Sequence, residues 1–154
     1  MKRVLFFTHS LSNGAGIERM TTSLANALED EGLVIRIVVL SSVIDSFYRL
    51  NKEIEVVSLR VNKFLSLQSI VNLRKMIKEW KPDYIINSGV QMSMTSILSS
   101  IGFSCKVITW EHFFLKAGSK CGYLMRIFSV IFGFKQVVLT ETDLLDYPKL
   151  FRKP

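Results

Sequence analysis

The sequence predicts one α/β domain, residues 1–154, built on a parallel sheet of about six strands with helices on both faces. Short apolar runs rich in β-branched residues alternate with longer segments in which apolar residues recur at helical spacing. The links between these segments are short, which is typical of repeated strand–helix–strand units. A chain of 154 residues, 49% of them hydrophobic and 21% charged, is also long and apolar enough to bury a sizeable core.

The first strand–helix–strand unit occupies the beginning of the chain. The apolar run RVLFFT at residues 3–8 predicts a strand covered on both faces. Gly32 stands where a helix commonly ends, and LVIRIVVL at residues 33–40 predicts the second strand. The helix between the two strands is expected to place a stripe of apolar residues on the sheet: Ile17, Met20, Leu24, Ala27 and Leu28.

The same alternation continues to the end of the chain. We expect further strands at residues 54–60, 83–88, 106–111 and 136–141. We expect helices at residues 67–80, 92–101 and 122–134, and a short helix from about Asp143 onward. Pro82 ends the first of these helices, whose apolar face comprises Ile70, Leu73, Ile77 and Trp80.

Six strands linked in this way commonly take the order 3-2-1-4-5-6. In that order the chain changes direction across the sheet between the first and fourth strands, and ligands bind at the carboxyl ends beside this point. The order therefore predicts a binding site formed by three loops, at residues 9–16, 87–91 and 111–116.

The first of these loops carries Gly14, Ala15 and Gly16 just before the expected start of a helix. Glycine permits positive φ and lets a ligand approach the backbone, and a helix start presents free N–H groups and partial positive charge. Together these features predict a site for a phosphate or another anionic group. A turn that needs positive φ is the alternative.

The loop does not match two common nucleotide-binding motifs. Arg19 stands where the third glycine of G-x-G-x-x-G would be, and the second strand ends in VVLSS without an acidic residue for a ribose. The loop also lacks the G-K-S/T sequence of a Walker loop.

The two histidines, His9 and His112, are both expected at carboxyl ends of strands, facing the predicted site. An imidazole there can donate to a hydroxyl, assist proton transfer or contact a phosphate. A hydrogen-bonded structural role is the alternative for each. Glu111 precedes His112, but adjacent residues leaving a strand point in opposite directions, so the two need not act on the same atom.

Further polar side chains follow the fourth and sixth strands. Asn87, Ser88 and Gln91 offer hydrogen-bonding groups suited to sugar or ribose hydroxyls. Thr140 and Glu141 are expected to end the sixth strand in the same way. Solvated loop polarity is the alternative for any one of them.

The composition restricts the partners. A net charge of +7 favours contact with phosphates, nucleic acid or anionic lipid without choosing among them. The basic residues are scattered without an aromatic–basic motif, so we expect no nucleic-acid partner. Cys105 and Cys121 form neither a disulfide framework nor a metal-ligand spacing, and a reducing cytoplasm is the simplest compartment for them. No apolar run reaches the roughly 18 to 20 residues of a membrane span.

Four segments in order along the chain resemble the amino-terminal domain of family 4 glycosyltransferases. SLSNGAGIERMTTSLANALEDEGLVIRIVVL resembles the family's glycine-rich loop, its helix E-R-x-x-x-x-L-A-x-x-L and its second strand. LRKMIKEWKPDYIINSG resembles a helix, the sequence K-P-D and the fourth strand. VITWEHFF resembles the fifth strand ending in an acidic residue and a histidine, and VVLTETDLLDY resembles the sixth strand and the short helix after it.

The resemblance implies half of a GT-B fold, in which two Rossmann-like domains face each other across a cleft. The amino-terminal domain mainly shapes the acceptor site, and the carboxy-terminal domain mainly holds the nucleotide-sugar donor. It also implies a hexosyltransferase that retains anomeric configuration, with the nucleotide-sugar as co-substrate and no metal or other cofactor. By position, Gly14 and Gly16 lie near the donor phosphates, His112 matches the histidine that contacts the transferred sugar, and Glu111 is carried over as its neighbour.

The donor half of the family carries an E-x7-E motif, whereas this sequence ends at LFRKP. We therefore expect an isolated half, or a half that a second polypeptide completes, which binds part of an acceptor without turnover. The alternative function is that of a non-catalytic interaction subunit, which pairs with a partner or with itself through an exposed apolar face.

Many members of the family act on lipid-linked or cell-envelope saccharides at the cytoplasmic face of the membrane. The segments KCGYLMRIFSVIFGFK (120–135) and VNKFLSL (61–67) combine basic and apolar residues in a way that suits an anionic interface. For the first segment, the alternative is a core helix that covers the sheet.

Overall fold

The computed structural model describes residues 1–61, 63–112 and 120–147. These residues form a six-stranded sheet in the order β3-β2-β1-β4-β5-β6, and every neighbouring pair of strands is parallel. The strands are β1 Arg3–Thr8, β2 Val34–Val39, β3 Glu55–Ser58, β4 Tyr84–Ser88, β5 Lys106–Trp110 and β6 Lys135–Val137. The helices are α1 Gly16–Asp30, α2 Leu67–Trp80, η1 Val90–Met92, α3 Ser93–Ser100, α4 Lys120–Phe132 and α5 Glu141–Asp146. The predicted Rossmann-like α/β fold and strand order are confirmed.

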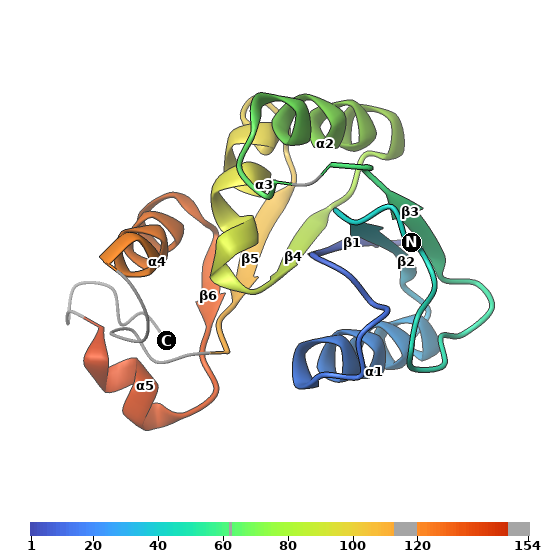
Figure 1. Ribbon diagram of the computed structural model, residues 1–154, viewed down its shortest axis with the longest axis horizontal. Helices are drawn as coiled ribbons and strands as arrows, with labels where there is room; N and C mark the ends of the chain where they lie inside the picture. The colour runs from blue at the N-terminus through green and yellow to red at the C-terminus, as the bar shows by residue number, and fades with distance from the viewer. Residues whose placement is uncertain (62, 113–119, 148–154) are drawn as a thin grey trace.

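The sheet separates two apolar cores, because side chains alternate between its faces. Val4 and Phe6 of β1 pack on the face that α1 covers, together with Ala25 of that helix. Leu5 and Phe7 pack on the opposite face, which α2 and α3 cover. Figure 1 shows α1 on one side of the sheet and α2 and α3 on the other, with α4 next to α3.

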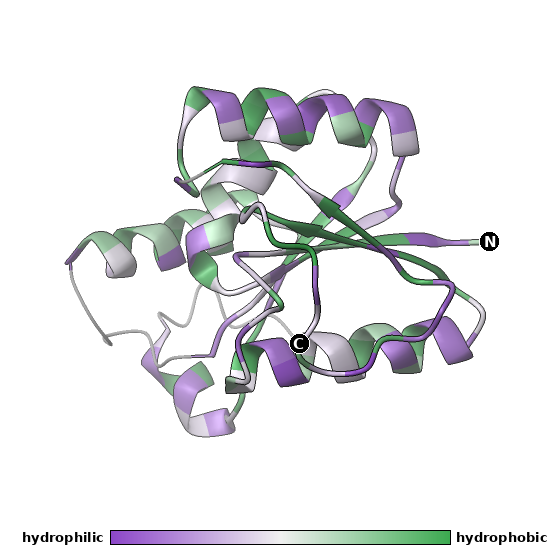
Figure 2. Ribbon diagram, turned by 45° about the vertical axis from the view of Figure 1, so that its right-hand side comes forward, coloured by the Kyte–Doolittle hydropathy of each residue, from purple (hydrophilic) through white to green (hydrophobic). Residues whose placement is uncertain are grey.

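Local sequence signals explain where the helices begin and end. Gly32 has φ +83°, and its N–H donates to Glu29 while that of Leu33 donates to Leu28, a paired closure of the last turn of α1. At the start of α2, Ser66 and Ser69 each bond the other's backbone N–H, which satisfies two groups that the helix leaves free. Figure 2 shows the strands largely in the colour of hydrophobic residues, between helices that also carry hydrophilic ones.

Leu24 and Leu28 of the expected stripe of α1 pack against the core, but the structure corrects the rest of the stripe. Its buried residues are Glu18, Thr21, Thr22 and Ala25, whereas Met20 is 43% exposed. The buried face starts with polar residues because the first turns of α1 lie against the polar end of β4, as described below. Apolar periodicity alone could not reveal this contact.

The end of the sheet also differs from the prediction. Strand β6 ends at Val137 rather than at residue 141. Thr140 instead precedes α5 as its N-cap, and its side chain accepts a hydrogen bond from the backbone N–H of Asp143. Thr140 and Glu141 therefore do not end a strand, because helix capping competes with strand pairing at a threonine followed by acidic residues.

Candidate functional site

The carboxyl ends of all the parallel strands lie along one edge of the sheet. The loop before α1, the η1 turn after β4, and Glu111 and His112 after β5 meet at this edge. The strands β1 and β4 are neighbours, so the edge contains the point at which the chain changes direction across the sheet. It is the place where the strand order predicts a ligand.

The start of α1 is open. Its N-cap is Ala15, which offers no side-chain hydrogen bond to the free N–H groups of the first turn. A Cβ atom added at Gly16 would meet nothing within 4 Å. The backbone amides at this helix start are thus free to meet a ligand, and Gly16 leaves room for it.

Gly14 has a different reason to be glycine. A Cβ atom there would lie 3.0 Å from the Phe47 ring, and the Tyr48 hydroxyl donates to the Gly14 carbonyl at 2.9 Å. The loop after β2 therefore packs tightly on the glycine loop. Neither Gly14 nor Gly16 has positive φ, so the alternative of a turn that needs it is wrong.

A buried hydrogen bond connects α1 to the end of β4. The Thr21 hydroxyl donates to the Ser88 hydroxyl at 2.8 Å, and both side chains are buried. Ser88 pairs in register with Trp110 of β5, so the two side chains lie side by side on the α1 face of the sheet. The Trp110 ring in turn lies 5.1 Å from the His112 ring, centroid to centroid. The start of α1 and His112 therefore lie on one face, on either side of the end of β4.

Several buried polar atoms on this face have unmet hydrogen-bonding capacity. Glu18 Oε2, Thr22 Oγ1 and His112 Nε2 are shielded from solvent and have no hydrogen-bond partner within the described part of the chain. An unmet buried polar group costs about 1–3 kcal/mol. A ligand that carries hydroxyl groups would recover part of that cost. Burial also lowers the pKa of His112 below its ordinary value, which favours the neutral imidazole with one donor and one acceptor nitrogen.

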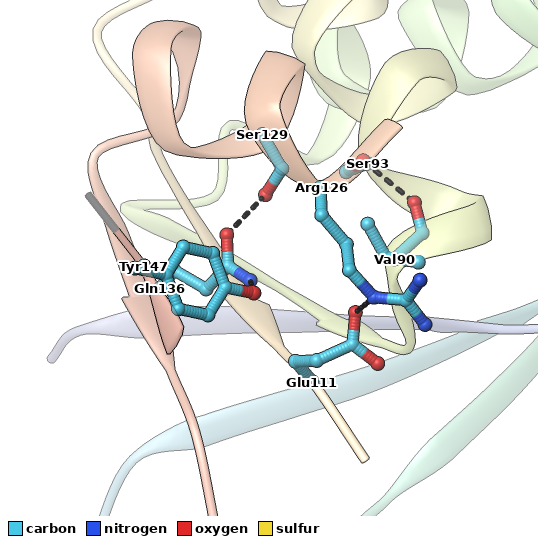
Figure 3. Close-up of polar contacts among 7 residues, drawn as sticks. All are labelled: Val90, Ser93, Glu111, Arg126, Ser129, Gln136 and Tyr147. Carbon is cyan, nitrogen blue, oxygen red and sulfur yellow. Dashed lines mark hydrogen bonds and ion pairs between the residues drawn. The ribbon is translucent and has the colours of Figure 1, made fainter. Parts of the chain in front are cut away.

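Asn87 and Glu111 lie on the opposite face. Asn87 donates to the Thr109 hydroxyl at 3.1 Å, and both residues are fully buried. Glu111 is 1% exposed, and its Oε2 accepts a hydrogen bond from Nε of Arg126 at 2.8 Å (Figure 3). The expectation that Glu111 and His112 need not act on the same atom agrees with this arrangement, since they contact different layers of the fold.

A chain of polar contacts continues beyond the ion pair. On α4, Ser129 is hydrogen-bonded to Gln136 of β6 at 3.1 Å, and Gln136 donates to the Tyr147 hydroxyl at 2.5 Å. Burial, reinforced by the nearby Glu111 carboxylate, raises the pKa of Tyr147 well above its ordinary value. No sequence pattern predicted this network, although Arg126 is conspicuous as the sole charged residue between Cys121 and Phe132.

The other predicted residues are more exposed. The His9 side chain is exposed, while its carbonyl accepts a hydrogen bond from the Ser41 N–H at 3.1 Å. Gln91 is exposed in η1, next to Gly89, whose φ of +118° favours glycine. Thr140 is exposed and caps α5. Residues 113–116 of the third predicted loop lie outside the described residues.

Within the described residues, no three His, Cys, Asp or Glu side chains are grouped as a metal site would require. Cys105 and Cys121 are free thiols. None of the described helices is both long and apolar enough to cross a membrane.

No family model matches the chain. The chain is 32% identical over 122 residues to the GalNAc-alpha-(1->4)-GalNAc-alpha-(1->3)-diNAcBac-PP-undecaprenol alpha-1,4-N-acetyl-D-galactosaminyltransferase of Campylobacter jejuni. It is 23% identical over 117 residues to an uncharacterized glycosyltransferase of Haemophilus influenzae. Each alignment covers 73% of this chain and 33% of the relative, so the chain spans about a third of the length of these relatives.

The fold is similar to that of Anabaena Alr3699/HepE, which was solved in complex with UDP and glucose. The TM-score is 0.69 at 13% sequence identity, and the match covers 95% of this chain and 40% of the other. The six-stranded Rossmann-like sheet is thus the one found in GT-B glycosyltransferases.

Proposed function

We propose that this chain is the acceptor-side domain of a glycosyltransferase that transfers a hexose from a nucleotide-sugar to a saccharide or lipid-linked acceptor. Two glycosyltransferases among its relatives and the GT-B type of sheet support a glycosyltransferase domain. The observation that carries the proposal is the placement of the open start of α1 and of His112 on one face of one sheet edge.

Each element has a role that its chemistry suits. The free amides at Gly16 stabilise negative charge on a phosphate or a sugar oxygen. The neutral His112 imidazole donates to, or accepts from, a hydroxyl of the transferred or accepting sugar. Glu18 and Thr22 offer buried hydrogen-bonding atoms beside the same helix start. We further propose, from the family resemblance, that transfer retains anomeric configuration and needs no metal.

The acceptor class we propose is a saccharide carried on a polyprenyl diphosphate, used in cell-envelope polysaccharide synthesis. The Campylobacter jejuni relative is named for a saccharide on PP-undecaprenol. Such an acceptor combines sugar hydroxyls with phosphates, and both match the groups at the α1 edge.

A binding experiment tests this function. The ¹⁵N-labelled chain is titrated with a panel of nucleotide-sugars and with undecaprenyl-diphosphate-linked saccharides in detergent. We expect chemical-shift changes at the amides of Gly16 and Ile17 and at the His112 ring, and weaker binding of at least one ligand by His112→Gln. His9→Gln is the comparison: His9 is exposed, whereas Nε2 of His112 is buried, so we expect its change to weaken binding less. Shifts confined to other parts of the chain, or none with any ligand, would contradict the proposal.

We also propose that this domain binds peripherally to an anionic membrane at its cytoplasmic face through α4. α4 packs against α3 and β6 with its buried side, as the alternative of a core helix expects. Leu124, Ile131 and Phe132 on the helix are nevertheless 66%, 52% and 62% exposed. Lys120 begins this helix and Lys135 follows it, and α4 contains no acidic residue. Basic residues beside exposed apolar ones match an anionic lipid surface. In the second predicted segment, Leu65 and Leu67 are exposed as well, whereas Phe64 packs against the core.

Sedimentation with phosphatidylglycerol vesicles tests the membrane proposal. We expect binding at low salt that weakens at high salt and falls in the variant Leu124→Ser/Phe132→Ser. Ile101→Ser is the control, since Ile101 is similarly exposed at 62% but follows α3. Absence of binding at low salt would contradict the proposal. Concentration-dependent self-association or capture of a donor-domain chain, lost in the same double variant, would instead support the non-catalytic interaction subunit.

A further inference from the structure

We propose that Arg126 of α4 is a positioning residue for His112, acting through the side chain of Glu111. The inference rests on the proposed function, because it assigns a cause to the placement of the residue expected to contact sugar. It concerns a residue of α4 that contacts Glu111 on the face of the sheet opposite to α1.

Glu111 is fixed at two points. Its backbone N–H donates to the Val137 carbonyl at 2.8 Å, which continues the pairing of β5 with β6 by one residue. Its carboxylate accepts from Arg126 Nε at 2.8 Å, in a pair with side chains 4% and 1% exposed. His112 is the next residue, so these two contacts set the direction in which the chain leaves the strand.

On the other face, the described contact of the His112 ring is with Trp110, at 5.1 Å and an angle of 33° between the rings. A ring contact of this kind tolerates sliding and tilting. The ion pair does not, because a charge-assisted hydrogen bond depends on both distance and direction. Of these two side-chain contacts, the ion pair with Arg126 is therefore the more restrictive.

The choice of a charged pair at this place supports a positioning role. Two apolar side chains of similar volume often stabilise a fold as well as a buried ion pair does, because desolvation offsets much of the attraction. Apart from Arg126, α4 has no charged residue between Cys121 and Phe132. Figure 3 shows the Arg126 side chain extending from α4 past Val90 to Glu111. A pair with one allowed geometry is useful where the direction of a neighbouring side chain matters.

The chain contains two histidines, so the ring of His112 can be observed directly by NMR in a His9→Gln background without any ligand. Arg126→Lys retains the charge but removes the Nε–H donor. We expect the His112 ring resonances to move, and its titration midpoint to rise towards the ordinary histidine value of about 6.5 as the ring becomes more exposed. Ser129→Ala is the control, because it removes the contact to Gln136 and leaves the pair in place.

A second variant, Arg126→Met/Glu111→Leu, covers the case in which the lysine variant fails to fold. It replaces both charges and keeps the volume, so we expect it to fold and still to show displaced His112 resonances. Unchanged His112 resonances and midpoint in a folded variant, with only a lower unfolding midpoint, would overturn the proposal and leave Arg126 a structural role. Failure of sugar binding in the parent chain would instead count against the proposed function, since these measurements use no ligand.

Discussion

The Thr21 hydroxyl of α1 donates to the Ser88 hydroxyl at the end of β4 over 2.8 Å, and this buried bond fixes the start of the helix against the strand next to β1. It links sequence positions 67 residues apart. Because Ser88 is also in register with Trp110, the bond connects the α1 side of the site to the His112 side. The integrity of the site should therefore depend on a contact between two small hydroxyl side chains.

Thr21→Val tests this dependence. The change keeps the shape of the side chain but leaves the buried Ser88 hydroxyl without its donor, so we expect a loss of about 1–2 kcal/mol in the free energy of unfolding. Thr22→Val is the matched control, because Thr22 Oγ1 is buried and has no hydrogen-bond partner among the described residues, so its removal should be neutral or stabilising. Urea denaturation of both variants checks the difference. Equal losses in the two would show that the hydroxyl bond contributes nothing specific.

Substitutions at the two loop glycines should separate packing from binding. Gly14→Ala places a Cβ atom 3.0 Å from the Phe47 ring, and we expect it to cost about 1 kcal/mol of stability. Gly16→Ala meets no atom, and alanine favours a helix, so stability should be unchanged or slightly higher. Ligand binding, measured by calorimetry, should nevertheless weaken in Gly16→Ala because the methyl group occupies the open space at the helix start.

A double variant checks whether the Phe47 ring causes the loss of stability expected for Gly14→Ala. Phe47→Ala removes the ring that opposes Gly14, so adding Gly14→Ala to it should cost less than adding it to the parent chain. If the losses in free energy of unfolding of the two single variants simply added in the double variant, contact with the Phe47 ring would not explain the cost of Gly14→Ala.

The sequence predicted the sheet and its order because buried parallel strands leave a local signal. The bounds of β1 and α2 are confirmed to the residue, and Gly32 ends α1 as expected. The buried polar face of α1 was not predictable in this way, since Thr21 is bonded to Ser88, which lies 67 residues away in the sequence. Glu111 and His112 could be assigned to opposite faces by alternation, but the partner of Glu111 lies on α4, and spacing alone does not identify it.

Stability should depend on pH through His112. Its pKa in the folded chain is lowered by burial, so below the ordinary histidine value of about 6.5 the unfolded chain binds more protons than the folded one. The contribution of His112 is therefore intact above about pH 6.5 and is lost as the pH falls through and below that value. We expect the difference in free energy of unfolding between the parent and His112→Gln to change between pH 8 and pH 5. A flat profile would contradict the burial of the His112 ring.

Replacing one partner of the buried ion pair should lower the free energy of unfolding strongly, whereas replacing both partners should lower it only slightly. Arg126→Met leaves the Glu111 carboxylate, 1% exposed, without its guanidinium, and we expect a loss of about 3–5 kcal/mol in the free energy of unfolding. Adding Glu111→Leu removes the stranded charge and should restore most of that loss. Guanidinium chloride denaturation of the two single variants and the double variant measures the coupling. If the double variant were no more stable than Arg126→Met, the pair would be needed for folding itself, since burial of the Glu111 carboxylate without the guanidinium could no longer explain the loss.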